Sequence, residues 1–566
     1  MPALHKNEAD PEVWVSLFFY VLGNLQTEFA GVEFPMPRGK SDRPTFKPYD
    51  QYQADLIPPT AIELVPENHL VRVVDDVLNQ LDLSSLMARY DKGGGASRYH
   101  PTMLLRVWVY AYISKVYSGR QIAKQLRENL PMRWLAGAQT PDFRTLNTFR
   151  SSKLAPVIEE VFVSSVRLLE AKGYVTLKTY FVDGTKIEAN ANKYSFVWGN
   201  AVDTFDNKMD QQLRAYVKAA QEIARAEDEA YGDRDLEEME KPRWTKDDIQ
   251  KLGVELNRKL ATLENKPLDP SREERKKKLR AMAKKVSGDF LDRKTKYEQS
   301  KAILAGRKSY SKTDTDATFM RMKEDPMRNG QLKPGYNVQI GTENGFVLDF
   351  ALFPNPTDTR TLKPHLDQFE RHHGRLPHTV VADAGYGGEE NYQYLEDNKV
   401  RAVVKYNWFH KEQRKAFKKQ IYRQENWPYD LASDSFECPK KHKAAYVRTK
   451  DEVSESGYKQ LLKLYRVDEC GGCSVKALCT KGEANRTLGV NWTLRRLKEQ
   501  AKKLLTSDEG IHLRKRRCVE VEPVFAKIKH NGHFRRFHLR GLGKVKTEWG
   551  LLSLSENLQR MALRRT

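Results

Sequence analysis

Two aspartates follow apolar, β-branched segments of the sequence. Asp183 ends the segment Val175–Asp183 and is followed by Gly184, and Asp383 follows Val380-Val381-Ala382. We expect each segment to be a strand that stops at its aspartate. Because ligands in α/β sheets gather beyond the carboxyl ends of strands, the two carboxylates are candidates for one shared site. Aspartate before glycine is also ordinary turn chemistry, so neither residue decides the matter alone.

A third carboxylate lies in a later segment that has a helical pattern, between Val519 and Lys529. Glu522 and Lys529 are seven residues apart, which is two helical turns, so a continuous helix puts them on one face. A solvated charged face is the alternative. Three hard oxygen ligands suit Mg²⁺ or Mn²⁺ and leave positions for water and phosphate. Asp183, Asp383 and Glu522 are therefore the predicted metal-binding and catalytic residues, around two ions that activate an attacking oxygen and stabilise a leaving one.

Four of the five cysteines lie close together in the sequence, at Cys438, Cys470, Cys473 and Cys479. The Cys-Gly-Gly-Cys turn at 470–473 is of the kind that presents two thiolates to one zinc ion. Since Cys438 has no partner two residues away, the pattern is incomplete, and free thiols are the alternative to a structural Zn²⁺. Cys518 lies outside the set and is expected to be a small packing residue.

Basic residues are concentrated near the third carboxylate. Between Ile511 and Arg540 there are nine Lys or Arg residues against two Glu, with Phe534 and Phe537 beside an arginine pair. This composition predicts a surface for a phosphate backbone, and a solvated basic helix is the alternative. The predicted DNA-binding residues are Lys529, Arg535, Arg536, Arg540, Arg516 and Arg517.

The elements that must position these residues are strands mixed with crossover helices. Strand patterns at 175–184, 336–340 and 345–350 are followed by a helix, a strand at 379–382, a second helix and a strand at 400–405. This order predicts an α/β fold whose sheet has both parallel and antiparallel pairs. A Lys-, Glu- and Ala-rich segment, 206–305, predicts long helices, with a break at Lys266–Pro270.

The chain of 566 residues divides into several expected regions. A helical pattern from Ile57 to about Arg150 includes a loop at Lys92–Gly95 and a helix that begins at His100-Pro101. The predicted regions are an N-terminal extension (1–55), a helical N-terminal domain (56–170), an α/β core (171–205 and 306–406), a helical insertion (206–305), a cysteine-bearing insertion (407–484) and C-terminal helices that complete the core (485–566).

Composition excludes several classes of protein. The 97 Lys and Arg residues against 75 Asp and Glu give a net charge of +22, which favours a polyanionic partner. Mean hydropathy is −0.70, and the apolar run Val13–Leu22 is shorter than the roughly 18 residues that a membrane span needs. Acidic residues before that run disfavour a secretion signal. An odd, small number of cysteines fits a reducing cytosol.

Several motifs occur together in one order along the chain. In the N-terminal region they are Tyr99–Leu104, Tyr117–Ala123 and Pro141–Arg150. In the core they are Val182–Lys193, Pro334–Gln339 and Ala382–Gly387, and in the C-terminal region Val521–Phe525, Phe534–Phe537 and Leu539–Gly541. In these motifs the sequence resembles the DDE transposases of bacterial insertion sequences, in the branch with a helical N-terminal domain and a cysteine-bearing insertion. The resemblance extends from about Ile57 to the C-terminus.

The resemblance implies an RNase H-like core in which Asp183, Asp383 and Glu522 bind divalent ions. It implies hydrolysis of a phosphodiester at each element end, followed by transfer of the freed 3′-OH into target DNA. The partners would be the terminal inverted repeats, recognised by the N-terminal domain, and target DNA, bound by a dimer or larger homo-oligomer. The location would be the bacterial cytoplasm, on the nucleoid, with no membrane association.

The position of the third acid has an alternative. Related transposases carry Tyr seven residues and Arg four residues before the glutamate, and Lys seven residues after it. Counted from Glu522, Lys529 fits, but Lys515 and Cys518 replace the other two. Counted from Glu520, Arg516 and Lys527 fit and Leu513 replaces Tyr. The Val-Glu-Pro-Val-Phe context favours Glu522.

Two other functions stay open at this stage. A nuclease on the same core would cut DNA without joining it. A domesticated DNA-binding protein would retain DNA without needing a divalent metal. The three acids favour the transposase.

Overall fold

The computed structural model describes residues 60–90, 98–231, 243–264, 270–322 and 330–565. The predicted extension 1–55, the apolar run Val13–Leu22, the loop Lys92–Gly95 and most of the break at Lys266–Pro270 lie outside the described residues. The described residues from Ala61 onward pack together as one compact unit. None of the helices described is long and apolar enough to cross a membrane.

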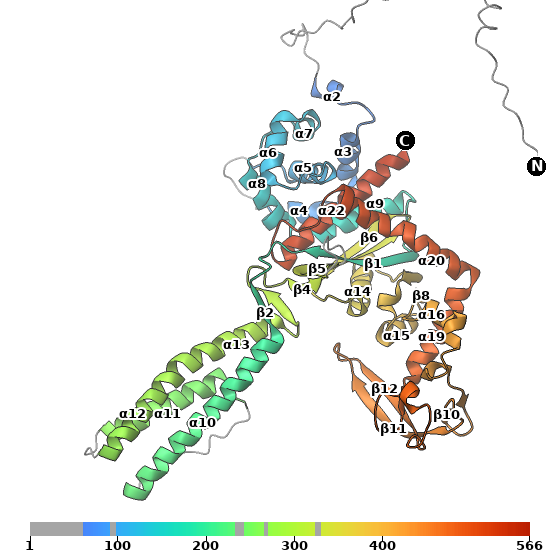
Figure 1. The fold of residues 1–566 in the computed structure, drawn as a ribbon. Helices are drawn as coiled ribbons and strands as arrows, with labels where there is room; N and C mark the ends of the chain where they lie inside the picture. Colours follow the sequence, from blue (N-terminus) through green and yellow to red (C-terminus); the bar gives the residue numbers. More distant parts are fainter. Residues whose placement is uncertain (1–59, 91–97, 232–242, 265–269, 323–329, 566) are drawn as a thin grey trace, which may run out of the picture. The chain divides into compact units, whose positions relative to one another are not determined.

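The central sheet combines antiparallel and parallel pairing (Figure 1). Its strand order is β4-β5-β1-β7-β8, with β6 also paired to β5. β1 runs antiparallel to β5 and parallel to β7, and β8 is parallel to β7. The strands are β1 (Thr179–Glu188), β4 (Thr318–Arg321), β5 (Leu332–Glu343), β6 (Phe346–Phe353), β7 (Thr379–Ala382) and β8 (Arg401–Val404). Three antiparallel strands followed by two parallel ones, in the order β6-β5-β1-β7-β8, make this an RNase H-like mixed α/β fold, as the sequence predicts.

Helices cover both faces of this sheet. On one face Tyr180 contacts the ring of Phe369 in α14 (Leu362–His373). On the other face Phe350 contacts Phe162 in α9 (Ile158–Ala171), and the Arg516 guanidinium of α20 (Asp508–Glu520) lies over Phe181. Because successive strand residues point to opposite faces, Asp183 shares the α20 face with Phe181, and Gly184 faces α14.

Gly341 shows how closely the α14 face is packed. A Cβ atom there would lie 1.7 Å from a ring carbon of Tyr180, so only glycine leaves room for that ring. The Tyr180 hydroxyl in turn lies 3.0 Å from His365 Nε2. This contact fixes the first strand against the helix that follows β6.

The N-terminal helices pack on the C-terminal helix α22 (Leu542–Arg565). Buried Arg150 lies over the Trp108 ring and 3.7 Å from a carboxylate oxygen of Glu548 in α22. The Tyr117 hydroxyl donates to the carbonyl of Gly532 at 2.9 Å. As predicted, a helix begins at Pro101, where His100 caps it. The helices are α2 (Ala61–Leu64), α3 (Leu70–Gln80), α4 (Ser84–Met87), α5 (Pro101–Ile113), α6 (Gly119–Glu128), α7 (Leu130–Leu135) and α8 (Phe143–Thr148).

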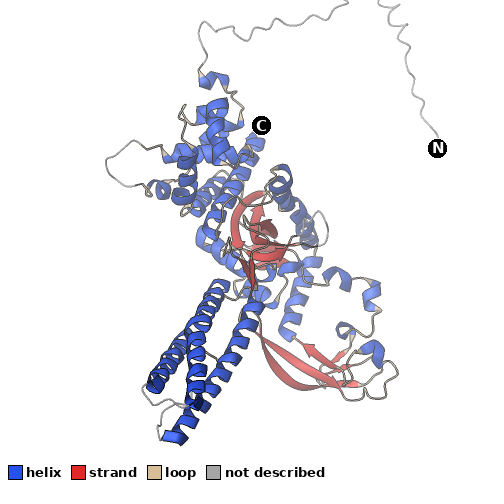
Figure 2. Cartoon of the chain, turned by 60° about the vertical axis from the view of Figure 1, so that its left-hand side comes forward, coloured by secondary structure: helices blue, strands red, loops and turns tan. Residues whose placement is uncertain are grey.

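Long helices occupy the segment between β1 and β4 (Figure 2). They share a core of their own, and the buried Lys294 ammonium lies 2.7 Å from Asp206 and 3.4 Å from Asp210. A two-stranded sheet closes the base of this segment. The elements are β2 (Phe196–Trp198), α10 (Gly199–Tyr231), α11 (Lys246–Glu264), α12 (Pro270–Lys285), α13 (Leu291–Leu304) and β3 (Ser309–Ser311).

A second sheet lies between β8 and the C-terminal helices. Its strand order is β13-β12-β11-β10-β9, and its small core includes Trp427, Phe436, Tyr465 and Leu488. β13 extends this sheet past the predicted boundary at 484, because it pairs with β12. The elements are β9 (Tyr429–Asp430), β10 (Ser435–Glu437), β11 (Lys443–Val453), β12 (Lys459–Val467), α18 (Lys476–Cys479), β13 (Thr487–Val490) and α19 (Trp492–Thr506).

Candidate active site

Asp183 lies in the middle of β1. The prediction that the strand ends at Asp183-Gly184 is wrong, because β1 continues to Glu188 with β5 as its partner throughout. The strand also begins at Thr179 and not at Val175, since Leu177 has a positive φ of 59°. One oxygen of the Asp183 carboxylate accepts from the Gly184 amide at 2.8 Å. The ladder with β5, which continues before and after Asp183 along the strand, therefore holds this carboxylate in place.

Asp383 follows β7 directly, as predicted. Its Oδ1 atom accepts from the amide of Gly385 at 2.7 Å and caps the short helix η4 (Ala384–Tyr386). Because β1 and β7 are neighbouring parallel strands, Asp383 comes to the same part of the sheet as Asp183.

Glu522 begins a new helix. A continuous helix through Val519–Lys529 is a wrong prediction: α20 ends at Glu520, α21 (Glu522–Ala526) follows, and a π-helix, η6 (Lys527–Asn531), comes next. Pro523 lacks an N–H group and its ring clashes with the carbonyl four residues earlier in a continuous helix, which explains the break. Glu522 and Lys529 therefore do not share an exposed face: the Glu522 side chain is 54% exposed, whereas Lys529 is 6% exposed.

Arg517 contacts two of the three predicted carboxylates and is affected by the charge of the third. It is buried, and its Nη1 atom donates to Oδ2 of Asp183 at 3.0 Å. Its Nη2 atom lies 3.6 Å from Oε1 of Glu522. Burial acts to lower the pKa of this guanidinium, but the negative charges of Asp183 and Asp383 outweigh burial and raise that pKa. Asp183 and Glu522 thus share one positive group, and Asp383 lies near enough for its charge to act on that group.

A buried tyrosine responds to the same charges. Tyr386 follows Asp383 in η4, and burial raises the pKa of its hydroxyl well above the ordinary value. The charges of Asp358, Asp183 and Asp383 raise this pKa further, in that order. Its hydroxyl donates to the side chain of Gln339. Because the charge of Asp358 acts on Tyr386 together with those of Asp183 and Asp383, Asp358 is a fourth carboxylate near the predicted three.

Asp358, Asn337 and Gln339 are residues that the sequence analysis missed. Both amides are fully buried in β5, and each donates to Asp358 Oδ1, at 2.8 and 2.9 Å. A Cβ at Gly184 would lie 2.8 Å from that oxygen, and one at Gly385 would lie 3.5 Å from Asp358 Oδ2. Asp358 therefore packs against the backbone next to both catalytic candidates. The available signal was Asn-Val-Gln, two polar residues alternating inside an otherwise apolar strand.

Glu520, the alternative third acid, lies elsewhere. It is 4% exposed, its Oε2 atom accepts from the Gly345 amide at 2.5 Å, and its Oε1 atom accepts from Arg516 at 2.8 Å. Arg516 also donates to Asn344 at 2.6 Å. Glu520 and Arg516 thus hold α20 to the β5–β6 turn, and the carboxylate beside Arg517 is that of Glu522.

Lys405 is another residue without a sequence prediction. It follows β8 at the same edge of the sheet as Asp383, and its amide donates to the carbonyl of Ala382 at 3.3 Å. Burial and then the charge of Arg517 lower the pKa of its ammonium group, and the charge of Asp383 opposes them. Its signal was a lysine directly after a buried strand.

The predicted DNA-binding residues fall into two groups. Arg516 and Arg517 pair with carboxylates and Lys529 is buried, as described above. Arg535, Arg536 and Arg540 are exposed. Arg536 donates to the carbonyls of Ala189 and Ala191 at 3.2 Å, and Arg540 donates to that of Asn190 at 2.7 Å. The arginine segment is therefore fixed to the chain that follows β1.

The donor set fits a divalent ion of the magnesium type. Three carboxylates from separate elements surround one cationic group, and oxygen donors are what such ions prefer. Among the residues described, no group of three or more His, Cys, Asp or Glu side chains already has the geometry to hold a metal ion. The donors are thus gathered around Arg517 and not yet arranged around an ion.

Two family models match the chain. The model described as "Transposase domain (DUF772)" matches residues 59–152, which contain the N-terminal helices. The model described as "Transposase DDE domain" matches residues 437–562, which contain Arg517, Glu522 and most of α22. No curated protein matches the chain.

Fold and comparisons lead to one class of protein. The RNase H-like sheet carries the predicted acids on β1, directly after β7 and on a late helix. Both matched families are transposase domains, and the pair is typical of insertion-sequence transposases with a helical N-terminal domain. The chain therefore carries two segments that match transposase domains, one in its N-terminal helices and one around Glu522.

Proposed function

We propose that this transposase cleaves phosphodiester bonds at the ends of its element in a reaction that requires Mg²⁺ or Mn²⁺, and then joins the freed 3′-OH to target DNA. The observation that carries the proposal is the convergence of Asp183, Asp383 and Glu522 on Arg517 across the sheet. The transposase domains matched on both sides of the core support it.

Each acid has a distinct part in this proposal. Asp183 and Asp383 are held by backbone amides, so they form the fixed part of the site. Glu522 is more exposed and begins a short helix after a break, so it is the ligand that can adjust. Bound divalent ions would supply activation of the attacking oxygen and stabilisation of the leaving oxygen.

The cationic side chains would act on the carboxylates and on phosphate. In the structure Arg517 offsets the repulsion among three negative charges, and it can turn toward phosphate when a divalent ion takes over that role. Lys405, half-buried near Asp383, would contact the DNA backbone as a point charge. Arg535, Arg536 and Arg540 would contact the backbone further along, since Arg536 pairs with Glu188, about 17 Å along β1 from Asp183.

The partners follow from the same proposal. The N-terminal helices would recognise the terminal inverted repeats, and two chains would pair the two ends. The protein would act on DNA in the bacterial cytoplasm.

Cleavage of end-containing DNA tests this function. Asp383→Asn and Asp183→Asn should each reduce metal-dependent cleavage by more than about 100-fold, because even outer contacts to metal ligands are worth about 10–100-fold. Asp367→Asn is the matched control, since Asp367, which lies on α14, accepts from the Tyr394 hydroxyl and makes no hydrogen bond or ion pair with the three acids in the structure described. Unchanged cleavage by both site variants would contradict the proposal.

Joining is tested separately. Pre-cut ends and a target plasmid should yield joined products with the unmodified protein. Cleavage without joined product would favour the nuclease alternative. Retention of DNA without any metal-dependent cleavage would favour the DNA-binding alternative.

A further inference from the structure

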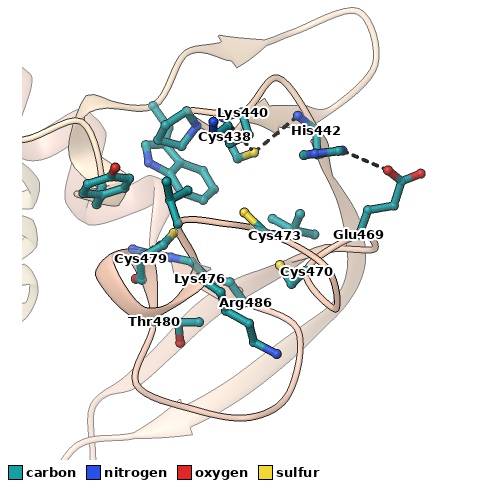
Figure 3. A pocket seen from close by; sticks show the side chains of 15 residues that line it. Cys438, Lys440, His442, Glu469, Cys470, Cys473, Lys476, Cys479, Thr480 and Arg486 are labelled. Atoms are coloured by element: carbon teal, nitrogen blue, oxygen red, sulfur yellow. Dashed lines mark hydrogen bonds and ion pairs between the residues drawn. The ribbon is translucent and has the colours of Figure 1, made fainter.

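The four clustered cysteines come together at one end of the second sheet. Cys438 follows β10, Cys470 and Cys473 lie in the turn after β12, and Cys479 ends α18. All four line one small cavity of about 20 Å³, together with Trp427 and Val467 (Figure 3). Residues 41 positions apart in the chain thus line one partly open cavity.

Hydrogen-bond donors surround the sulfur atoms. The amides of Lys440 and His442 donate to Cys438 Sγ at 3.4 and 3.3 Å, in a turn where Lys441 has a positive φ of 65°. Arg486 Nη1 lies 2.9 Å from Cys479 Sγ. Such donors can hydrogen-bond the sulfur of a metal-bound cysteine as well as that of a free one.

The Cys470–Cys473 turn leaves its two sulfurs free to face the cavity. The Cys473 amide donates to the Cys470 carbonyl at 3.4 Å, which closes the turn. The two intervening glycines carry no side chains, and a Cβ at either would meet no atom within 4 Å. Figure 3 shows the sulfurs of Cys438, Cys470 and Cys473 facing a common space, with Cys479 beside them. In the structure described, all of these cysteines are free thiols.

The second sheet has little else to hold this end together. Its buried core consists of seven residues, one of which is Cys470. Small units with such a core commonly depend on a disulfide or a structural metal. A four-cysteine set is the usual ligand set of structural zinc.

We propose that Cys438, Cys470, Cys473 and Cys479 bind one structural Zn²⁺. His442 lines the same cavity, with its Nδ1 atom 2.9 Å from Glu469, but the four cysteines complete a tetrahedral set without it. No described group of three ligands has metal geometry yet, so binding would draw the sulfurs together within the cavity.

The metal would fix the base of a hairpin that reaches the catalytic core. Cys438 precedes β11 and Cys470 follows β12, so the two cysteines flank the β11–β12 hairpin in the chain. At the other end of the β11–β12 hairpin, Glu455 pairs with Arg360, two residues after Asp358, and Ser456 donates to Glu390 in α15 (Glu389–Asp397) at 2.5 Å. An effect of zinc on cleavage rests on the proposed function, but the presence of zinc does not.

Metal analysis of the full chain tests the site directly. We expect about one zinc ion per purified chain, and thiolate-to-metal charge-transfer bands when Co²⁺ replaces it. Cys470→Ser and Cys479→Ser should each lose the ion. Cys518→Ser, which removes the exposed fifth cysteine, and His442→Ala should both keep it.

A second measurement covers variants that fail to fold. In the unmodified protein, a thiol reagent should release zinc in step with modification of four cysteines, leaving Cys518 to react separately. A chain without zinc that shows no charge-transfer bands after Co²⁺ addition would overturn the proposal. Loss of zinc in His442→Ala with retention in Cys479→Ser would overturn the ligand set. Both results can be obtained whether or not the protein cleaves DNA.

Discussion

The acidic site and the cysteine cluster differ in how the chain brings their residues together. Asp183 and Glu522 are 339 positions apart and meet only because β1, β7 and the α20–α21 break lie at one part of the sheet. The cysteines lie within one insertion and line one small cavity, in which Cys470 is buried and the other three are half-buried. Among the acids, the Glu522 side chain is 54% exposed, whereas Cys470 among the cysteines is 9% exposed. An accessible oxygen site suits exchange with substrate, and a closed sulfur site suits permanent structure.

Removal of divalent metal should produce the largest difference between the acidic site and the cysteine cluster. A short treatment with EDTA should abolish cleavage, because the oxygen site exchanges its ions with solvent. Addition of Mg²⁺ should restore cleavage at once, while the zinc content stays constant throughout. Cleavage assays and metal analysis on the same samples measure this. Loss of zinc in parallel with activity, without recovery in Mg²⁺ alone, would contradict the distinction.

Substitution of Glu522 should affect cleavage and not stability, whereas substitution of Glu520 should affect stability and not cleavage. Glu522→Gln should lose cleavage with a stability change within about 0.5 kcal/mol, because the side chain is exposed. Glu520→Gln should keep cleavage in the folded protein and lose about 1–3 kcal/mol of stability, because it weakens buried bonds to Gly345 and Arg516.

Urea unfolding and cleavage of end-containing DNA measure the two glutamate effects. If Glu520→Gln abolishes cleavage without changing stability, the third acid has been misplaced.

The Asp358 network should have an intermediate effect. Asp358→Asn removes a charge that two buried amides bind, and should lower cleavage by about 10–100-fold, as outer contacts to metal ligands do. Gln339→Ala should act in the same direction. Steady-state cleavage rates check both, with Asp367→Asn as control. Rates equal to that of the unmodified protein would show that the network only supports the strand.

A smaller effect is expected from a buried pair on the α14 face. Burial acts to lower the pKa of His372, but Asp349, 3.2 Å away, outweighs it and raises that pKa. A raised pKa adds stability below the unfolded pKa of about 6.5, and this contribution is lost as pH rises through the folded pKa.

The thermal midpoint of the unmodified protein should therefore exceed that of His372→Gln by more at about pH 5.5 than at about pH 8.5. His365 and His373 on the same helix have lowered pKa values, so they also influence how stability depends on pH. The difference between the unmodified protein and His372→Gln is therefore the quantity that reports on His372. A difference that does not change with pH would contradict the pairing.

The fold could be predicted from local patterns, but part of the site could not. The order of strands and helices was visible because buried strands are apolar and β-branched. The extent of β1 past Asp183 was not visible, since it depends on pairing with β5. Pro523 already indicated a helix break near Val521, whereas the seven-residue spacing between Glu522 and Lys529 suggested one continuous helix. Arg517 and Asp358 acquire their partners only through tertiary packing.

The cysteine cluster was easier to predict, because its four members lie within 42 residues of sequence. The glycines between Cys470 and Cys473 indicated the turn directly. What the sequence could not provide was the position of His442, which lies among the cysteines but pairs with Glu469.

The most direct test of the central claim is cleavage of the protein itself by bound iron. Fe²⁺ placed in the divalent site, with ascorbate and peroxide, cuts the polypeptide backbone close to the metal. If Asp183, Asp383 and Glu522 hold one metal centre, cuts should appear near all three positions, compete with Mg²⁺ and disappear in Asp383→Asn. Cuts confined to other segments, or cuts that persist unchanged in that variant, would contradict the account.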